Sequence, residues 1–328
     1  MAATVNQAFD EFNINCVNLD SDRTKVARDS RDWLIKQLIS FPEKIEDFPD
    51  LYEDKHIRFG SFARNTKIRP LDDIDLIITF RADGTTYLKH QHDEYTLTVP
   101  ESATNLRKLC NDDYTLNSIK VVNKIVKSLN QIEQYKQAEI NRSKEAATLK
   151  LNSYEWNFDI VPAFYTDTGY YVIPNGEGKW KATDPRIDQK RVSEIIDKHG
   201  KRILQIIRTL KYWNRRAQMP TIPSYLFENF VLIYLESQIS ISDYIDGNLI
   251  KFWDYLKSAI YLSVKDPKGF QDELNNLTYD EKIKISSKAV ETYNKGYEAY
   301  KIETEDKDQE KAIKKWTEIF GDDFPKYE

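Results

Sequence analysis

The 328-residue sequence has few residues of the kinds that cross-link chains or hold soft metals, with two cysteines and four histidines. Two cysteines cannot build the disulfide framework of a small secreted domain, and we expect Cys16 and Cys110 to be reduced thiols with structural roles. His90 and His92 are close in sequence, but no cysteine or third histidine lies near them. This composition argues against a zinc site.

Long apolar runs are also missing. No hydrophobic stretch approaches the roughly 20 residues that a membrane-spanning helix needs. Residues 1–7 lack the basic region and apolar core of a signal peptide. We therefore expect a cytoplasmic protein with no membrane partner. With 40% hydrophobic and 31% charged residues, the chain has the composition of a globular protein of one large domain or two lobes.

An excess of positive charge, which proteins held on nucleic acids usually carry, is absent as well. The formal net charge is −5 and the isoelectric point is about 5.6. Bulk electrostatics would therefore not hold this protein on DNA or RNA. Basic residues do cluster at 198–202 and around Lys211. We interpret all of them except Lys211 as solvated helix surface.

Residues 60–76 carry most of the functional information. Asp73 and Asp75 lead into an apolar stretch that begins at Leu76, as in a strand with acids at alternate positions. Side chains two residues apart in a strand point to the same face. Two carboxylates about 5 Å apart repel by about 3 kcal/mol at an effective dielectric constant near 20. Such a pair favours a cation between its members, and Mg²⁺ is the usual choice where substrate phosphates complete the coordination.

A small-residue turn precedes these acids. Gly60 and Ser61 lie about twelve residues before Asp73. Glycine can adopt a positive φ and lets the backbone approach a ligand closely. Consecutive N–H groups in such a turn can bind an anion, and the Ser61 hydroxyl can add a phosphate contact. The spacing predicts a triphosphate site; the alternative is an ordinary surface turn followed by a strand with an acidic edge.

A third carboxylate supports the triphosphate site. Residues 148–165 have the pattern of two strands joined by a turn near 152–153, and Asp159 lies among apolar residues of the second strand. A carboxylate in such surroundings is costly unless it is paired or bound to metal. If this strand lies beside residues 73–80, three acids share one face. Three acids around one point suit two divalent cations, the arrangement used for in-line displacement at phosphorus.

These motifs resemble the polymerase-β-like nucleotidyltransferase superfamily. The closer resemblance is to the CD-NTases of anti-phage defence, bacterial relatives of cyclic GMP-AMP synthase and oligoadenylate synthase. It runs from about residue 15 to the C-terminus and rests on several segments in combination. These are Ser61–Pro70, Trp180 with Thr183–Pro185, the helix Ile203–Arg216, Pro223–Tyr225, and Trp316–Pro325.

The resemblance implies an α+β fold of two lobes with the active site in the cleft between them. Residues 1–184 would form the nucleotidyltransferase core, a mixed sheet with helices that includes an N-terminal spine helix. Residues 185–328 would form a helical lobe like that of oligoadenylate synthase. Hydrophobic periodicity agrees, because strands are expected in the first half and helices in the second. The expected helices are 21–40, 118–138, 186–198, 200–217, 223–240, 248–262, 281–302 and 307–320.

The resemblance also implies roles for the acids. Asp73, Asp75 and Asp159 would bind two Mg²⁺ ions, with Mn²⁺ able to substitute, and would be the catalytic residues. Asp73 and Asp75 would hold both ions. Asp159 would contact only the catalytic ion, nearest the attacking sugar hydroxyl.

Six further residues are implied to bind the nucleotide. They are Gly60, Ser61, Thr66, Lys211, Ser224 and Tyr225. Lysine suits phosphate as a point charge, and an aromatic ring stacked on a base contributes about 1–3 kcal/mol. Lys211 would reach the triphosphate, Ser224 a phosphate, and Tyr225 the base. The alternative is that Lys211 is exposed and Tyr225 belongs to the first turn of a buried helix.

The implied reaction condenses ATP, GTP or pyrimidine nucleoside triphosphates into a cyclic di- or trinucleotide second messenger with release of pyrophosphate. In this CBASS-type antiviral signalling, a separate effector would bind the product. The chain lacks the His/Cys zinc thumb of the vertebrate DNA sensor, so we expect no requirement for double-stranded DNA. Two alternatives remain open. One is a nucleotidyltransferase that makes a linear oligonucleotide or modifies a small molecule; the other is a catalytically inactive nucleotide-binding relative.

Overall fold

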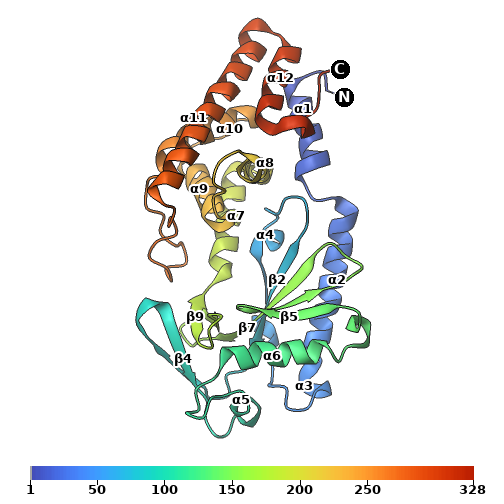
Figure 1. The fold of residues 1–328 in the computed structure, drawn as a ribbon, viewed down its shortest axis with the longest axis vertical. Coiled ribbons are helices and arrows are strands. Elements are labelled where there is room, and N and C mark those ends of the chain that lie inside the picture. The colour runs from blue at the N-terminus through green and yellow to red at the C-terminus, as the bar shows by residue number, and fades with distance from the viewer. Residues whose placement is uncertain (1) are drawn as a thin grey trace. The chain divides into compact units, whose positions relative to one another are not determined.

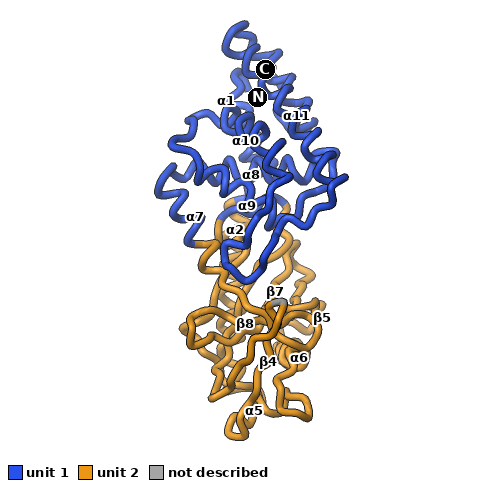
Figure 2. Tube along the Cα trace, turned by 90° about the vertical axis from the view of Figure 1, so that its left-hand side faces the viewer, with its two compact units in different colours: residues 1–20, 65–69, 190–328 blue, residues 21–64, 70–189 orange. Residues whose placement is uncertain are grey.

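The protein is described by a computed structural model over residues 2–328, with only the backbone of His92 included. Figure 2 shows its two compact units. We call residues 21–64 and 70–189 the sheet unit, and residues 2–20, 65–69 and 190–328 the helical unit. The chain passes between the units after residues 20, 64, 69 and 189.

Within the described residues, the sheet unit contains a mixed sheet of nine strands (Figure 1). Its order is β1-β2-β7-β8-β9-β4-β3, and β6 joins β5 to β7 at the side of this path. Among the strand pairings of the described residues, only that of β2 with β7 is parallel. The strands are β1 (Ile57–Phe59), β2 (Asp73–Phe80), β3 (Thr86–Lys89), β4 (Glu94–Thr98), β5 (Glu139–Ser143), β6 (Ala146–Lys150), β7 (Asn157–Tyr165), β8 (Tyr171–Pro174) and β9 (Trp180–Thr183).

The helices of the sheet unit are α2 (Ser21–Ile39), α3 (Phe41–Lys44), α4 (Gly60–Ala63), α5 (Thr104–Arg107) and α6 (Ser118–Leu129). Helix α6 packs against strands β5 to β8. The Asn117 side chain caps it by accepting hydrogen bonds from the backbone N–H groups of Ile119 and Lys120. The prediction of a helix to residue 138 was too long. The buried stripe of α6 ends at Leu129, and the following residues are mostly exposed.

The helical unit contains α1 (Val5–Phe12), α8 (Ile203–Arg216), α9 (Ser224–Ser237), α10 (Ile245–Ala259), α11 (Tyr279–Lys301) and α12 (Gln309–Phe320). Helix α7 (Pro185–His199) begins in the sheet unit and continues into the helical unit. Aromatic rings fill the core of the helical unit. The ring centroids of Phe9 and Trp316 are 4.9 Å apart, and those of Trp213 and Trp253 are 5.7 Å apart.

The α+β class is confirmed, while the two units divide the chain differently from the expected boundary at residue 184. Residues 2–20 belong to the helical unit, because α1 buries Val5, Phe9 and Phe12 there. Residues 65–69 also belong to it, whereas all of α2, the expected spine helix, lies in the sheet unit. Cys16 and Cys110 are free thiols. Across residues 2–328 we find no helix long and apolar enough to cross a bilayer.

Candidate active site

The register of two parallel strands brings the predicted acids together. Asp75 on β2 is the register partner of Asp159 on β7, and Asp73 is paired with Asn157. Because alternate residues of a strand face the same side, Asp73, Asp75 and Asp159 share one side of the sheet. We call these three carboxylates the acid face. The sequence analysis made the three-acid face depend on the strand of Asp159 lying beside residues 73–80, and this condition is met.

Buried neighbours hold the acid face in position. Ile74 and Leu76 are each 1% exposed, and Phe158 and Ile160 are fully buried. These residues point to the opposite side of the sheet from the acids, which are all partly exposed. The alternation therefore anchors both strands in the core and leaves the carboxylates accessible from one side.

Thr148 is a neighbour of the acid face that the sequence analysis missed. It is the register partner of Asp159 on the antiparallel strand β6, and its Oγ1 donates a hydrogen bond to Asp159 Oδ1 at 2.6 Å. This bond restricts the rotation of the Asp159 carboxylate. The hairpin of β6 and β7 could be predicted from sequence, but its register could not.

Gly60 lies directly against the acid face. Its φ is +73°, as expected for a glycine turn, and the preceding residue, Phe59, is the register partner of Asp75. A Cβ atom at Gly60 would lie 1.7 Å from Asp75 Oδ2. Glycine is therefore required here because the Asp75 carboxylate occupies the space of a side chain. Ser61 follows in the same short turn, α4, so the turn and the acids adjoin within one unit.

The acid face fits part of a divalent cation site. Adjacent strands lie about 4.7–4.9 Å apart, so the side chains of Asp75 and Asp159 start one strand spacing apart, a separation that a bound cation can bridge. Their oxygens are the hard ligands that Mg²⁺ prefers. No group of three or more His, Cys, Asp or Glu side chains in the described part of the chain is already arranged to hold a metal ion. Further ligands would come from substrate phosphates and water.

Two other predicted residues lie together in the helical unit. Lys211 on α8 is 8% exposed, and its Nζ lies 2.9 Å from Glu228 Oε2 on α9. The Thr66 hydroxyl, fully buried, is 3.2 and 3.1 Å from the two Glu228 carboxylate oxygens. We call Thr66, Lys211 and Glu228 the Glu228 network. The alternative of an exposed Lys211 was wrong.

Glu228 was not identified from sequence, although a signal existed. It is 3% exposed and stands among the buried apolar residues of α9. A buried carboxylate needs a cation and further hydrogen bonds to offset its desolvation. Lys211 and Thr66 supply them. A glutamate within an otherwise apolar helix therefore predicts an internal partner, but packing decides which one.

Tyr225, in the first turn of α9, has a different set of neighbours. It is half-buried, while Ser224 before it is exposed. Lys268 Nζ lies 2.8 Å from the Tyr225 hydroxyl and 4.1 Å from the ring centroid. The Tyr225 hydroxyl is also 3.3 Å from Asp266 Oδ1. The sequence analysis missed Lys268 and Asp266, because they lie in the irregular segment between α10 and α11.

The predicted residues thus form three groups. Gly60 and Ser61 adjoin the acid face in the sheet unit. Thr66 and Lys211 meet in the helical unit through Glu228. Ser224 and Tyr225 stand at the start of α9, where Lys268 covers part of the tyrosine ring.

Comparison with known proteins places this chain in a family. No protein-family model matches the sequence. A protein of Bacillus cereus (strain VD146) named "Probable cyclic nucleotide synthase" is 48% identical over 337 residues, with all of both chains covered. E. coli MS115-1 CdnC, solved with ATP, has a similar fold over 98% of both chains, with a TM-score of 0.72 and 16% identity.

Vibrio cholerae DncV in its apo form also has a similar fold. It matches over 98% of this chain and 96% of its own, with a TM-score of 0.69 and 14% identity. Fold similarity and the full-length relative at 48% identity agree. The chain belongs to the family of cyclic nucleotide synthases, and it has the fold of CdnC and DncV.

Proposed function

We propose that this protein condenses nucleoside triphosphates into a cyclic oligonucleotide with release of pyrophosphate. The pairing of Asp75 with Asp159, beside Asp73 and the Gly60 turn, is the observation that carries the proposal. Solved relatives support it. CdnC has been solved with ATP, and DncV is named a cyclic AMP-GMP synthase and has been solved with the linear intermediate 5′ pppA(3′,5′)pG.

The acid face would hold two Mg²⁺ ions, or Mn²⁺ in their place. Bound there, the ions supply charge neutralisation of the triphosphate and a lowered pKa of the acceptor sugar hydroxyl. Asp73 and Asp75 would fix the donor triphosphate. Asp159, oriented by Thr148, would accept the proton of the acceptor hydroxyl. The hydroxyl oxygen then forms a bond to the donor α-phosphorus, and the bond from that phosphorus to the bridging oxygen breaks to release pyrophosphate.

Residues outside the acid face would bind the nucleotide. The Gly60–Ser61 turn would contact phosphate through its backbone N–H groups and the Ser61 hydroxyl. Lys211 has three donor positions on its ammonium group, so its bond to Glu228 leaves others for the triphosphate. Ser224 would contact a phosphate, and Tyr225 would stack on the base. Thr66 would act through Glu228.

The proposed setting is CBASS antiviral signalling in the cytoplasm, with a separate effector that binds the cyclic product. A protein is favoured over double-stranded DNA as the trigger. The net charge of −5 argues against a DNA groove, and E. coli CdnC has been solved in complex with a HORMA protein.

Product analysis tests the proposal directly. Purified, nuclease-treated protein is incubated with the four radiolabelled nucleoside triphosphates and Mg²⁺ or Mn²⁺, then with phosphatase, and separated by chromatography. A cyclic product has no terminal phosphate, so its label should survive phosphatase. Product whose terminal label is removed would instead identify a linear-oligonucleotide enzyme. No product under any condition would favour an inactive relative, and a strict need for added DNA would contradict the proposed trigger.

A further inference from the structure

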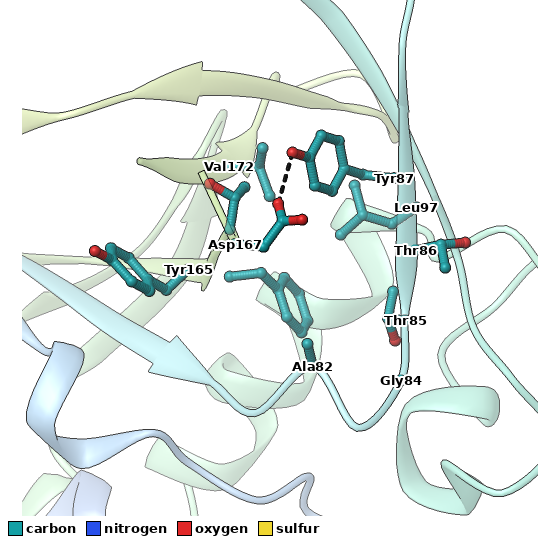
Figure 3. A pocket seen from close by; sticks show the side chains of 11 residues that line it. Ala82, Gly84, Thr85, Thr86, Tyr87, Leu97, Tyr165, Asp167 and Val172 are labelled. Atoms are coloured by element: carbon teal, nitrogen blue, oxygen red, sulfur yellow. Dashed lines mark hydrogen bonds between the residues drawn. The ribbon is translucent and has the colours of Figure 1, made fainter. Parts of the chain in front are cut away.

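Apolar side chains lie differently on the two units. In the sheet unit, Leu97 and Val172 line a hollow of about 650 Å³ and are only 2% and 1% exposed (Figure 3). In the helical unit, large apolar side chains reach the surface along α11 and at both ends of α10. Those that are at least 39% exposed are Tyr244, Tyr261, Leu262, Tyr279, Ile283, Val290, Tyr297 and Tyr300. A concentration of exposed apolar residues on one part of a soluble protein commonly marks an interaction site.

The long helix α11 carries two separate apolar stripes. The inner stripe is buried where α11 packs on α10 and α12, and it consists of Ile285, Ala289, Thr292, Gly296 and Ala299 (Figure 1). The second stripe, which we call the outer stripe, consists of Tyr279, Ile283, Ser286, Val290, Tyr293, Tyr297 and Tyr300. Its members alternate at spacings of four and three residues, which is the repeat of a helix that packs against another helix. The inner stripe accounts for the packing of α11 in its own unit, so the outer stripe remains for a partner.

Neighbouring groups fix the side chains of the outer stripe. The rings of Tyr293 and Tyr297 stack with centroids 6.0 Å apart and planes 8° apart. Lys257 Nζ on α10 lies 5.3 Å from the centroid of the Tyr293 ring. The Ser286 hydroxyl donates to the Lys257 backbone carbonyl at 2.6 Å. Side chains held in this way lose little conformational entropy when a partner binds, and tyrosine is a residue enriched at protein interfaces.

The charges beside the outer stripe indicate which partner fits. Asp280 in the first turn of α11 and Lys301 in its last turn are both exposed. They are separated by three seven-residue repeats, so they flank the outer stripe on the same side. A second α11 running antiparallel would place Asp280 of each copy beside Lys301 of the other. A parallel copy would instead place like charges together, which disfavours association.

The apolar side chains match in the same antiparallel register. With Asp280 opposite Lys301 of a second copy, Ile283 faces Tyr300 and Val290 faces Tyr293. Each aliphatic side chain would thus meet an aromatic ring. This alternation of smaller and larger side chains allows the two surfaces to interdigitate. Charge and shape therefore favour the same partner, a second copy of this chain.

We propose that two copies of this protein associate through the outer stripe, with their α11 helices antiparallel about a two-fold axis. In such an interface the same surface is used on both copies, so each pair of residues occurs twice. Helix α11 has 23 residues and is about 34 Å long. A contact one helix wide over this length is at the small end of specific interfaces, and we expect a dissociation constant of about 10 µM. The inference does not rest on the proposed reaction.

Sedimentation equilibrium of the full chain tests for the dimer. Between about 1 and 200 µM, the mean mass should rise from that of the 38.6 kDa monomer toward twice that value. Val290→Lys places a charge near the two-fold axis on both copies and should weaken association at least about 10-fold. Val26→Lys is the control, at a valine of similar exposure on α2 in the sheet unit, and should associate like the wild type. Circular dichroism checks that both variants fold.

A charge exchange tests the antiparallel register. Asp280→Lys and Lys301→Asp should each weaken the dimer about 10-fold at low ionic strength, because each replaces two attractive pairs by two repulsive ones. The double variant restores opposite charges and should recover an affinity within about 3-fold of the wild type. The capping box of α11 uses Thr278 and Glu281, so both variants at position 280 keep it.

Three results would overturn the inference. One is a protein that stays monomeric up to about 200 µM, since the outer stripe would then serve a different partner. Another is equal self-association of the wild type and Val290→Lys, or its loss in Val26→Lys, because the contact would then lie elsewhere. The last is a double charge variant that associates no better than the single variants, which would contradict the antiparallel register.

Discussion

The acid face and the Glu228 network use the same chemical group in opposite ways. On the sheet, three carboxylates share one partly exposed side. In the helical unit, one carboxylate is 3% exposed and has a lysine ammonium at 2.9 Å and a threonine hydroxyl at 3.1 Å. The negative charges of the acid face are suited to neutralisation by a bound cation. The Glu228 carboxylate is compensated from within the protein. We therefore expect loss of an acid-face carboxylate to lower activity without lowering stability, and loss of Glu228 to lower stability as well as nucleotide binding.

Removing a carboxylate from the acid face gives the largest expected effect. Asp75→Asn should lower product formation by about 10³-fold or more, because it removes charge and metal coordination together. The melting temperature should be unchanged or higher, since repulsion between the acids is relieved. Product chromatography and thermal unfolding measure the two effects. Asp112→Asn is the control at an exposed carboxylate; near-wild-type turnover of Asp75→Asn would remove the basis for the two-metal site.

Breaking the Glu228 network is expected to lower stability as well. Glu228→Ala leaves Lys211 buried without its partner, which should cost about 3–5 kcal/mol of unfolding free energy. The double variant Lys211→Met with Glu228→Gln keeps an acceptor for Thr66 and should recover part of this loss. Urea unfolding followed by tryptophan fluorescence provides the measurement.

An exposed ion pair serves as the matched control for that cycle. Lys190 and Glu194 on α7 are 77% and 63% exposed, with their charged atoms 3.6 Å apart. Breaking this pair should change stability by no more than about 0.5 kcal/mol. If breaking the exposed pair and breaking the Lys211–Glu228 pair cost a similar unfolding free energy, burial would not strengthen the interaction between Lys211 and Glu228.

A pair of glycines sharpens the role of geometry at the acid face. Gly60→Ala would place a Cβ atom 1.7 Å from Asp75 Oδ2 at a φ of +73°. Displacement of that carboxylate should lower activity by about 10²-fold. Gly200 has a similar φ of +83° with no atom near its Cβ position, so Gly200→Ala should cost only the backbone penalty of about 1–2 kcal/mol. Equal activity in the two variants would contradict the explanation that glycine is required at position 60 because a side chain there would displace the Asp75 carboxylate.

His56 gives the smallest expected effect. It differs from both groups of carboxylates because it is buried in its neutral form. Burial lowers the pKa of His56 from 6.5 to about 4, and its Nδ1 accepts a hydrogen bond from the Thr79 backbone N–H at 3.0 Å. The unfolded chain therefore binds a proton first as the pH falls. The neutral histidine's contribution to stability is complete above about pH 6.5 and is lost between pH 6.5 and 4, by about 2 kcal/mol after allowance for partial solvent screening.

Melting temperatures measured across this pH range test the assignment. His56→Asn keeps an acceptor for Thr79 without the titration, so its pH profile should be flatter than that of the wild type. The exposed His90 supplies the control His90→Asn, which should follow the wild-type profile. Parallel profiles for the wild type and His56→Asn would show that other groups account for the loss.

Local patterns were sufficient to predict several parts of the molecule. The alternation around Asp73 and Asp75 predicted a strand with both acids on one side, and β2 has that form. Helical periodicity predicted α8 and α12 to within a few residues. Short-range rules act in both cases: the two-residue period of a strand and the 3.6-residue period of a helix. The sequence could place Asp159 beside Asp75 only if β2 and β7 were assumed to be neighbouring strands.

Contacts between distant segments could not be predicted in this way. Thr148 meets Asp159 because of a hairpin register, and Glu228 meets Thr66 because residues 65–69 pack within the helical unit. The position of Lys268 depends on an irregular segment that has no periodicity. These side chains surround the predicted residues without belonging to any motif, so their partners become visible only when the packing is known.

The place of α1 in the helical unit has a consequence for the order of folding during synthesis. Phe9 packs against Trp316, and the Val5 backbone N–H donates to Gln309 Oε1 at 2.8 Å. At about 5–20 residues per second, a ribosome needs about 15–60 s to add the roughly 300 residues that separate these partners. Until then the apolar side of α1 has no native core to join. Nascent chains should therefore expose α1 to chaperones, and residues 190–328 expressed alone should fold poorly for lack of the same helix.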